Sequence, residues 1–318
     1  MSRRGVFNTD DGIAVRSMPD ADSGEGVRLR VTSVGICTTD FWVLAQGPSP
    51  FAIGHEFAGH LDDGTLAAVY PLARCGQCDQ CAKGAYNRCR RVFELSMGLG
   101  TDGGMCTELF VPEDSVTPLP DGVDPRDGLL VEPFAVGIHA IDRVDLQPGQ
   151  RVAVIGAGAL GLMVAAAVRA AGCETTIAAR HPHQVAAAER LGLGLGELRG
   201  EYDVVVDAAG NEAALAQAVE LLAPGGTLLL LSMYPPTGVS FPALPLLMKE
   251  ANVVTSTAYC CNNSKDDFAA SAEFLAKTPE VAEAVISHRF PLNEAPAAFA
   301  TAQDRAGGAI KVVVHPDA

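Results

Sequence analysis

The chain has 318 residues, of which 48% are hydrophobic and 19% charged, so it is long enough for two hydrophobic cores and its composition excludes disorder and fibrous structure. It carries 23 basic and 38 acidic groups, which gives a formal net charge of −15. A surface of that sign repels phosphate backbones and anionic lipid, which argues against a nucleic-acid or membrane-surface partner.

The first residues of the chain and its cysteines both indicate the cellular compartment in which the protein is expected. Residues 1–12 are polar and charged and lack the apolar core of a secretory signal, so we expect a cytoplasmic protein. Thiols stay reduced there, and nine cysteines then indicate metal binding or chemistry more than disulfides. The apolar stretch 152–168 contains three glycines, so a strand, a turn and a helix explain it better than a membrane span.

The N-terminal part of the chain has the pattern of an irregular β domain. Between residue 28 and about residue 120, short alternating runs such as 28–31 and 108–111 are broken by Gly, Pro and Asp.

From about Gly137 apolar runs alternate with helix-forming stretches. The expected strands are 152–155, 175–179, 203–206, 227–231 and 253–257. The expected helices are 160–171, 183–191 and 212–222. Short Gly/Pro turns join them, and this alternation predicts an α/β domain with a parallel sheet covered on both faces.

The pattern changes again after Tyr259, with a helix near 267–276 and a closing strand at 310–314. We expect this tail to rejoin the first domain. The predicted organisation is therefore a β domain of residues 1–131 and 259–318, interrupted by an inserted α/β domain of residues 132–258.

A glycine-rich turn follows the first strand of the inserted domain. Its sequence is Gly156-Ala157-Gly158-Ala159-Leu160-Gly161, and it opens an alanine-rich helix. In a dinucleotide fingerprint the first glycine permits the tight turn, the second lets the backbone approach the pyrophosphate, and the third lets helix and strand pack closely. The alternative is a plain turn in a glycine-rich chain, but the strand and helix around it favour dinucleotide binding.

The end of the second expected strand bears on which dinucleotide binds. An acidic residue there would hold the ribose hydroxyls of NAD, but the sequence reads Ala179-Arg180-His181 without a carboxylate. Arg180 offers a planar cation to a 2′-phosphate and His181 a further donor, so we expect NADP(H) to be preferred over NAD(H). The alternative is a solvated arginine on an exposed turn.

Four cysteines lie close together in a loop-like stretch of almost no apolar content. They are Cys75, Cys78, Cys81 and Cys89. Four thiolates at such spacing can complete a tetrahedral zinc shell that leaves no position for a substrate, so we predict a structural zinc site rather than an iron–sulfur cluster or free thiols.

A second metal site is suggested by a cysteine and a His-Glu pair. Cys37 follows an apolar run, and His55-Glu56 stands in Gly54-His55-Glu56-Phe57-Ala58-Gly59. Alone each would suit packing or the surface, but together they supply the mixed sulfur, nitrogen and oxygen ligands of an open catalytic zinc site.

The ordered motifs resemble those of the zinc-dependent medium-chain dehydrogenases, and the sorbitol and threonine dehydrogenase branch is most similar. The motifs are Gly-Ile-Cys-x-Thr-Asp ending at Asp40, Gly-His-Glu-x-x-Gly, the four-cysteine loop, Glu132-Pro133-x-Ala135-Val136-x-x-His139-Ala140, and the glycine turn. They span nearly the whole chain. The resemblance implies a GroES-like β domain completed by the C-terminus, with an inserted Rossmann domain.

The resemblance also assigns roles at the catalytic zinc. Cys37 and His55 would be ligands, and Glu56 a direct or switching ligand. Glu132 would stand near the metal and its water, where some relatives place a third protein ligand. Asp40 would orient the His55 ring.

Two further roles come from the resemblance. Thr39 would hydrogen-bond the substrate hydroxyl and pass its proton outward, and Lys311 would meet the cofactor pyrophosphate. Zinc would act as a Lewis acid toward the substrate oxygen while a hydride passes between the substrate carbon and the nicotinamide.

The chain departs from the family in three places. Where many relatives have a proton-relaying histidine, this chain has Trp42, its single tryptophan, which we interpret as either a wall of the substrate pocket or core. The hairpin region 60–74 is short. The third Rossmann strand and its helix, in 192–201, look nearly deleted, so we expect a sheet shortened at that edge.

The leading hypothesis is an NADP(H)-preferring zinc-dependent alcohol or polyol dehydrogenase that acts on a secondary alcohol or its ketone. The alternatives are an NAD-dependent sugar or cyclitol alcohol dehydrogenase, an inactive structural or sensing homologue, and a zinc ribbon that binds nucleic acid or protein. We expect Phe41, Met97 and Tyr259 to be further pocket candidates. We also expect a homodimer or homotetramer, with 228–231 and the apolar loop 241–248 as candidate contacts.

Overall fold

The computed structural model describes residues 3–19, 26–262 and 265–316. They form two compact units: one comprises Met1–Ala135, Cys260–Ala282 and Ile286–Ala318, the other Val136–Tyr259 and Glu283–Val285. The expected division was at 131/132 and 258/259. In the structure residues 132–135 belong to the first unit instead of the second, and residue 259 and Glu283–Val285 belong to the second unit instead of the first. Phe134 stacks on Phe274 with 4.6 Å between ring centroids, which ties residues 132–135 to the first unit.

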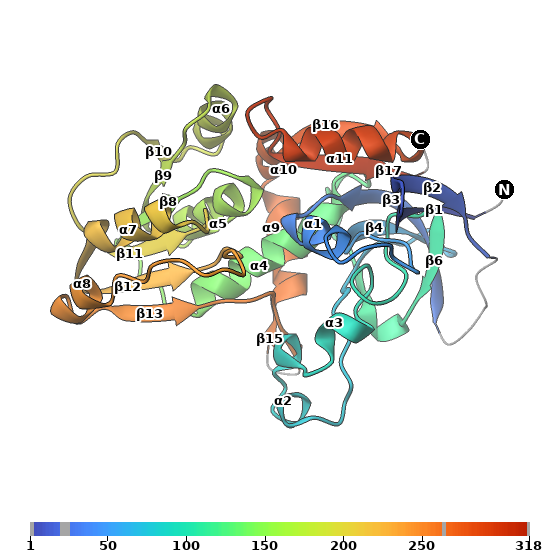
Figure 1. The fold of residues 1–318 in the computed structure, drawn as a ribbon, viewed down its shortest axis with the longest axis horizontal. Helices are drawn as coiled ribbons and strands as arrows, with labels where there is room; N and C mark the ends of the chain where they lie inside the picture. Colours follow the sequence, from blue (N-terminus) through green and yellow to red (C-terminus); the bar gives the residue numbers. More distant parts are fainter. Residues whose placement is uncertain (1–2, 20–25, 263–264, 317–318) are drawn as a thin grey trace. The chain divides into compact units, whose positions relative to one another are not determined.

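The first unit is built on a seven-stranded sheet in the order β16-β17-β3-β4-β5-β7, with β6 pairing with β3. The strands are β3 (Val27–Gly35), β4 (Glu56–Leu61), β5 (Leu66–Val69), β6 (Glu108–Val111), β7 (Val116–Pro118), β16 (Ile286–Pro291) and β17 (Lys311–His315). Strand β17, red in Figure 1, runs antiparallel to the blue β3 and sets Val313 opposite Gly35. The C-terminal strand thus completes the N-terminal sheet, as the sequence predicts for a GroES-like domain.

Shorter elements complete this unit. The strands are β1 (Arg4–Thr9), β2 (Gly12–Ser17), β14 (Cys261–Asn262) and β15 (Lys265–Asp266). The helices are α1 (Thr38–Leu44), α2 (Asp79–Ala82), α3 (Val92–Leu95), α9 (Asp267–Lys277), α10 (Glu280–Val285), which ends in the second unit, and α11 (Ala295–Gln303). The 3-10 turns are η1 (Tyr86–Arg88), η2 (Glu113–Ser115), η3 (Gly128–Leu130) and η4 (Leu292–Glu294). The sequence reading missed α11, whose Phe299 packs into the core of the sheet with Leu29 and Val312.

The second unit is a six-stranded parallel sheet in the order β10-β9-β8-β11-β12-β13. Its strands are β8 (Arg151–Ile155), β9 (Glu174–Ala178), β10 (Gly194–Leu195), β11 (Tyr202–Asp207), β12 (Leu222–Leu230) and β13 (Asn252–Thr255). The helices are α4 (Val131–Asp142), which begins in the first unit, α5 (Ala159–Ala170), α6 (Pro182–Arg190), α7 (Glu212–Leu221) and α8 (Ala243–Met248). The order reverses direction at β8, as in a Rossmann fold, which confirms the predicted fold class.

The shortened edge is present as predicted. Strand β10 has only two residues, and between it and β11 the described chain forms no helix. Two expectations were wrong in detail. Strand β12 starts at Leu222, which pairs with Tyr202, and residues 223–226 form an irregularity before Thr227 pairs with Val204. The expected loop 241–248 contains α8. No helix within the described ranges is long and apolar enough to cross a bilayer.

Candidate catalytic and cofactor sites

Two paired strands bring the Cys37 and His55-Glu56 motifs together. Strand β3 ends at Gly35 and β4 begins at Glu56, and these two residues are opposite each other in the antiparallel register. Cys37 is the N-cap of α1, where its backbone N–H donates to the Asp40 carboxylate at 2.8 Å. Residues separated along the chain therefore converge at one corner of the sheet.

Cys37, His55 and Glu56 place one ligand atom each within 4.8 Å of one another. Asp40 stands behind His55, with its carboxylate 3.1 Å from the imidazole Nδ1, so Nε2 is left for a metal. The side chains of Asp40 and Glu56 are buried, and sulfur, nitrogen and oxygen are together a donor set that zinc accepts. The residues present fit a catalytic zinc ion.

The electrostatics of this corner favour a cation. Burial opposes the charged imidazolium of His55, but the Asp40 carboxylate and Cys37 outweigh burial and raise the pKa of His55 well above its usual value. A site that stabilises a proton on His55 is a site of negative potential, and that same potential attracts a metal ion.

Lys311 is buried in this corner. Its ammonium group donates to both carboxylate oxygens of Glu56 at 2.7 Å and to the Ile36 carbonyl at 3.3 Å. Burial opposes its charge, yet Glu56, Cys37 and Glu132 together raise the pKa of Lys311, so the lysine stays protonated. The pairing with Glu56 was missed by the sequence reading, and the role expected for Lys311 toward pyrophosphate stays a prediction.

Thr39 and Glu132 lie near the three candidate ligands. The Thr39 hydroxyl is 3.7 Å from the Cys37 sulfur. Glu132 is buried in the first turn of α4, and its charge acts on Lys311, but it is outside the group of three whose ligand atoms converge.

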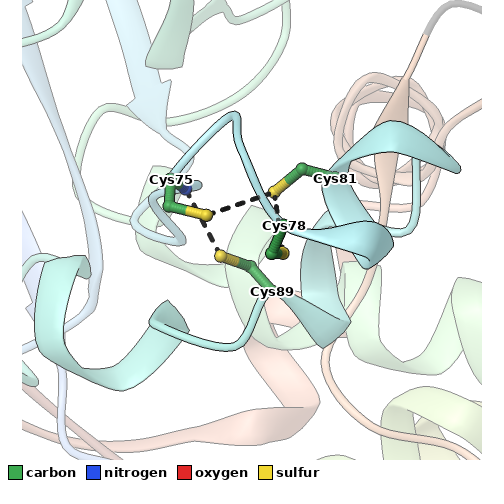
Figure 2. A group of neighbouring side chains, drawn as sticks. All are labelled: Cys75, Cys78, Cys81 and Cys89. Atoms are coloured by element: carbon green, nitrogen blue, oxygen red, sulfur yellow. Dashed lines mark hydrogen bonds between the residues drawn. The ribbon is translucent and has the colours of Figure 1, made fainter.

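The four-cysteine loop closes on itself. Figure 2 shows the side chains of Cys75, Cys78, Cys81 and Cys89 pointing at a common centre, and their sulfur atoms all lie within 4.8 Å of one another. Backbone N–H groups of Arg90 and Cys81 lower the pKa of Cys78 to about 6, which favours the thiolate that a metal requires. This geometry fits a four-thiolate zinc site.

The glycine turn has the shape that a diphosphate needs. Gly156 has φ +109°, a region that favours glycine. A Cβ on Gly161 would collide with the Gly156 carbonyl oxygen, whereas a Cβ on Gly158 would meet nothing within 4 Å. The second glycine therefore faces open space at the N-terminus of α5, where free N–H groups and the helix dipole favour an anion. The residues fit a dinucleotide.

The tip after β9 presents Arg180 and His181 and no carboxylate. Arg180 is exposed, and its guanidinium forms no ion pair with any residue in the described part of the chain. His181 is the N-cap of α6 and stacks on His183 with 5.4 Å between ring centroids.

The predicted pocket residues separate into exposed and buried ones. Trp42 is 42% exposed on α1 and lies 5.9 Å, centroid to centroid, from Phe93, which is 60% exposed. Phe41 packs edge-on against Phe299, Met97 is 8% exposed and Tyr259 is fully buried, and their role in a substrate pocket stays a prediction. Phe93 was missed because it lies in the short helix α3, and nothing in the local sequence marks it as a pocket residue.

Comparison with known proteins agrees with the fold. Residues 23–121 match the alcohol dehydrogenase GroES-like domain, and residues 159–277 match the zinc-binding dehydrogenase family. L-galactonate-5-dehydrogenase of Escherichia coli (strain K12) is 31% identical over 87% of each chain. Sorbitol dehydrogenase of Bacillus subtilis (strain 168) is 28% identical over 98% of this chain and 96% of the relative.

Solved structures agree as well. A zinc-binding dehydrogenase from Sinorhizobium meliloti 1021, bound to NADP, has a TM-score of 0.89 at 27% identity and covers 99% of this chain and 100% of its own. A dehydrogenase from Escherichia coli CFT073, complexed with NADH, has a TM-score of 0.87 at 21% identity over 99% of this chain and 100% of its own, which shows the fold alone. The chain therefore belongs to the zinc-dependent medium-chain dehydrogenases/reductases. Within that family it is sorbitol dehydrogenase-like.

Proposed function

We propose that this chain is a zinc-dependent polyol dehydrogenase that interconverts a secondary alcohol and its ketone and prefers NADP(H) to NAD(H). The observation that carries the proposal is the convergence of Cys37, His55 and Glu56 in a chain that also has a dinucleotide turn. The substrate class rests on relatives named for L-galactonate, sorbitol and D-xylulose.

Two zinc ions per chain are part of the proposal. Cys75, Cys78, Cys81 and Cys89 would hold the structural ion. Cys37 and His55 would hold the catalytic one with a carboxylate, for which Glu56 is the first candidate because its oxygen is among the converging atoms, and Glu132 the second. Bound zinc supplies a Lewis acid, and bound nicotinamide accepts or donates hydride.

The chain's own residues orient these groups and move the proton. Asp40 fixes the tautomer and ring position of His55. The Thr39 hydroxyl, beside Cys37, would accept the proton of the substrate hydroxyl and pass it on. Because Trp42 stands where a histidine relay is common, the proton would continue through water.

The cofactor preference rests on Arg180. A planar guanidinium with no carboxylate beside it can form a bidentate contact with a 2′-phosphate. His181 would add a donor, and the backbone of Gly156, Gly158, Ala159, Leu160 and Gly161 would hold the pyrophosphate.

Trp42 and Phe93 are proposed as one wall of the substrate pocket. Two exposed aromatic rings in contact offer an apolar face, and the C–H groups of a polyol chain or sugar can pack on such a face. Trp42 lies three residues after Thr39, on the next turn of the same helix.

We also propose a cytoplasmic homodimer or homotetramer. Strand β13 is the last strand of its sheet, and Val253 on it is 42% exposed. The preceding helix α8 exposes Leu244, Leu247 and Met248 to 67%, 71% and 76%. An unpaired strand edge beside exposed apolar side chains is suited to pairing with a second copy of the chain.

A substrate panel tests the proposed function. Purified protein is assayed at the nicotinamide absorbance with sorbitol, xylitol, L-galactonate and their ketones, with both cofactors and in both directions. We expect turnover of at least one pair, two zinc ions per chain by elemental analysis, and loss of one ion and of turnover in Cys37→Ser.

A matched control is Cys173→Ser, which changes a buried cysteine of the second unit that hydrogen-bonds only a backbone carbonyl. It should keep both ions and full turnover. Full turnover in Cys37→Ser on the best substrate would contradict the catalytic role.

A further inference from the structure

One buried carboxylate in the Rossmann unit has no part in the reaction as described so far. Asp207 is the last residue of β11, and its side chain is fully buried. In the register of the sheet it is opposite Ile155, the residue before the glycine turn, on one side and Leu230 on the other. It therefore lies at the carboxyl end of the sheet, beside the point where the strand order reverses.

Both oxygens of the Asp207 carboxylate accept hydrogen bonds. One oxygen accepts from the backbone N–H groups of Ala209 at 2.9 Å and Gly210 at 3.0 Å, and the other accepts from the Tyr234 hydroxyl at 2.7 Å. No cation pairs with it among the residues that the structure describes. The charge of this buried carboxylate is stabilised only by hydrogen bonds. Loss of any one donor would therefore leave part of the charge unsatisfied.

Tyr234 is fixed as the donor in this pair. Burial, the hydrogen bond and the charge of Asp207 all raise the pKa of Tyr234 above its usual value, so its hydroxyl remains protonated. The hydrogen bond joins the loop after β11 to the segment after β12, and the Leu231 N–H also donates to the Asp207 carbonyl at 3.1 Å.

The joined loops touch the dinucleotide turn. A Cβ on Gly156 would lie 2.9 Å from the carbonyl carbon of Ala208 and from the nitrogen of Ala209. A Cβ on Gly210 would lie 2.7 Å from the Cβ of Ser232. The backbone at 208–210 is thus packed between the glycine turn and the 232–234 segment, so its position depends on the hydrogen bonds that Asp207 accepts.

The two halves of such a sheet hold the two halves of a dinucleotide. Arg180, at the end of β9, marks the adenosine side, and the ends of β11 and β12 are on the other side of β8. We propose that Tyr234 is a positioning residue for the nicotinamide half of the cofactor, acting through Asp207 on the segments 208–210 and 232–234. This inference rests on the proposed function, because it requires that the chain binds a nicotinamide cofactor.

Calorimetric binding of NADPH and of 2′-phospho-ADP-ribose, which lacks the nicotinamide, tests the inference. In Tyr234→Phe we expect the Kd of NADPH to rise about tenfold, since a hydrogen bond to a buried charge is lost, while the Kd of 2′-phospho-ADP-ribose stays within about twofold. On the best substrate pair, KM for NADPH should rise with the Kd. NADH and ADP-ribose replace these ligands if the protein prefers NAD(H).

Tyr202→Phe is the matched control, because Tyr202 is a buried tyrosine at the opposite end of β11. It should leave both Kd values unchanged. Equal weakening of both ligands in Tyr234→Phe, or no difference from Tyr202→Phe, would overturn the inference while the proposed function stands. If wild-type protein bound neither ligand, the proposed function would fail and the inference with it.

Discussion

At the scale of single residues, the proposed preference for NADP(H) rests on Arg180. Replacing Arg180 by Asp removes the cation proposed for the 2′-phosphate and supplies a carboxylate that can hold ribose hydroxyls. We expect KM for NADPH to rise at least about tenfold and KM for NADH to stay equal or fall, because a charge-assisted hydrogen bond contributes about 1.5–3 kcal/mol. Initial rates with both cofactors measure this.

The control for that change is Arg199→Asp. It alters the charge of the same unit by the same amount, but Arg199 is an exposed residue paired with Glu197 in the shortened loop. Cofactor preference should not move. A KM for NADPH that is unchanged in Arg180→Asp would remove the basis for the NADP(H) assignment.

A second prediction at the scale of residues concerns the buried ion pair of Glu56 and Lys311. Lys311→Met leaves Glu56 buried without its cation, and breaking a buried pair on one side destabilises a protein by about 3–5 kcal/mol. The double variant Glu56→Leu with Lys311→Met removes both charges and should regain a large part of that loss. Thermal unfolding of the cofactor-free proteins compares them, and a double variant no more stable than the single one would contradict the pair's coupling.

At the scale of elements, a substitution in the glycine turn can change cofactor binding without changing the stability of the fold. Gly158 has φ −77°, and a Cβ there meets no protein atom within 4 Å, so Gly158→Ala is tolerated by the fold. The methyl group instead occupies the space expected for the pyrophosphate. We expect an unchanged Tm without cofactor and a Kd for NADPH raised about tenfold or more. A variant with wild-type affinity would show that the dinucleotide lies elsewhere.

The four-cysteine loop should depend on its metal. Its own core is small, with Cys81, Cys89 and Val92 buried, and a segment of that size rarely folds without a metal or a disulfide. In Cys78→Ser we expect one zinc ion per chain instead of two and faster tryptic cleavage after Lys83 and Arg88. Cys173→Ser is again the control, and two retained zinc ions in Cys78→Ser would contradict the assignment.

Elements with a strong local pattern could be predicted from the sequence. The strands and helices around the glycine turn were, because apolar periodicity and turn glycines specify them locally. The start of strand β12 and the helix α8 were not, because a Pro-Gly-Gly bulge and the prolines of 242–245 look like loop sequence. The motif residues and the contact of Asp40 with His55 could be predicted from the resemblance, but the contact of Glu56 with Lys311 could not.

At the scale of the whole molecule, contacts distant in sequence limited the prediction. Lys311 contacts Glu56 at a sequence separation of 255 residues, and Tyr234 contacts Asp207 at a separation of 27 residues. The first contact depends on the pairing of β3 with both β17 and β4, and the second on the adjacent parallel strands β11 and β12. Such contacts follow from sheet register, which no local window of sequence contains.

The last prediction concerns strand β13, at the edge of the Rossmann sheet. Leu247 is 71% exposed on α8, next to β13 at the end of the sheet. If a second copy pairs there, Leu247→Glu places two like charges in an apolar interface, and burial of an unpaired charge is unfavourable. We expect light scattering after size exclusion to show a mass halved relative to the wild type, or a dissociation constant raised at least about a hundredfold.

The matched control for this edge is Phe93→Glu, which introduces the same charge at an exposed apolar residue of the other unit. Its assembly should equal that of the wild type even if its kinetics change. Because Leu247 is outside both zinc sites and the glycine turn, the zinc content of Leu247→Glu should remain at the wild-type value. An unchanged mass in Leu247→Glu at micromolar concentration would mean that the chain assembles through another surface, and the exposed apolar side chains of α8 would then need a different partner.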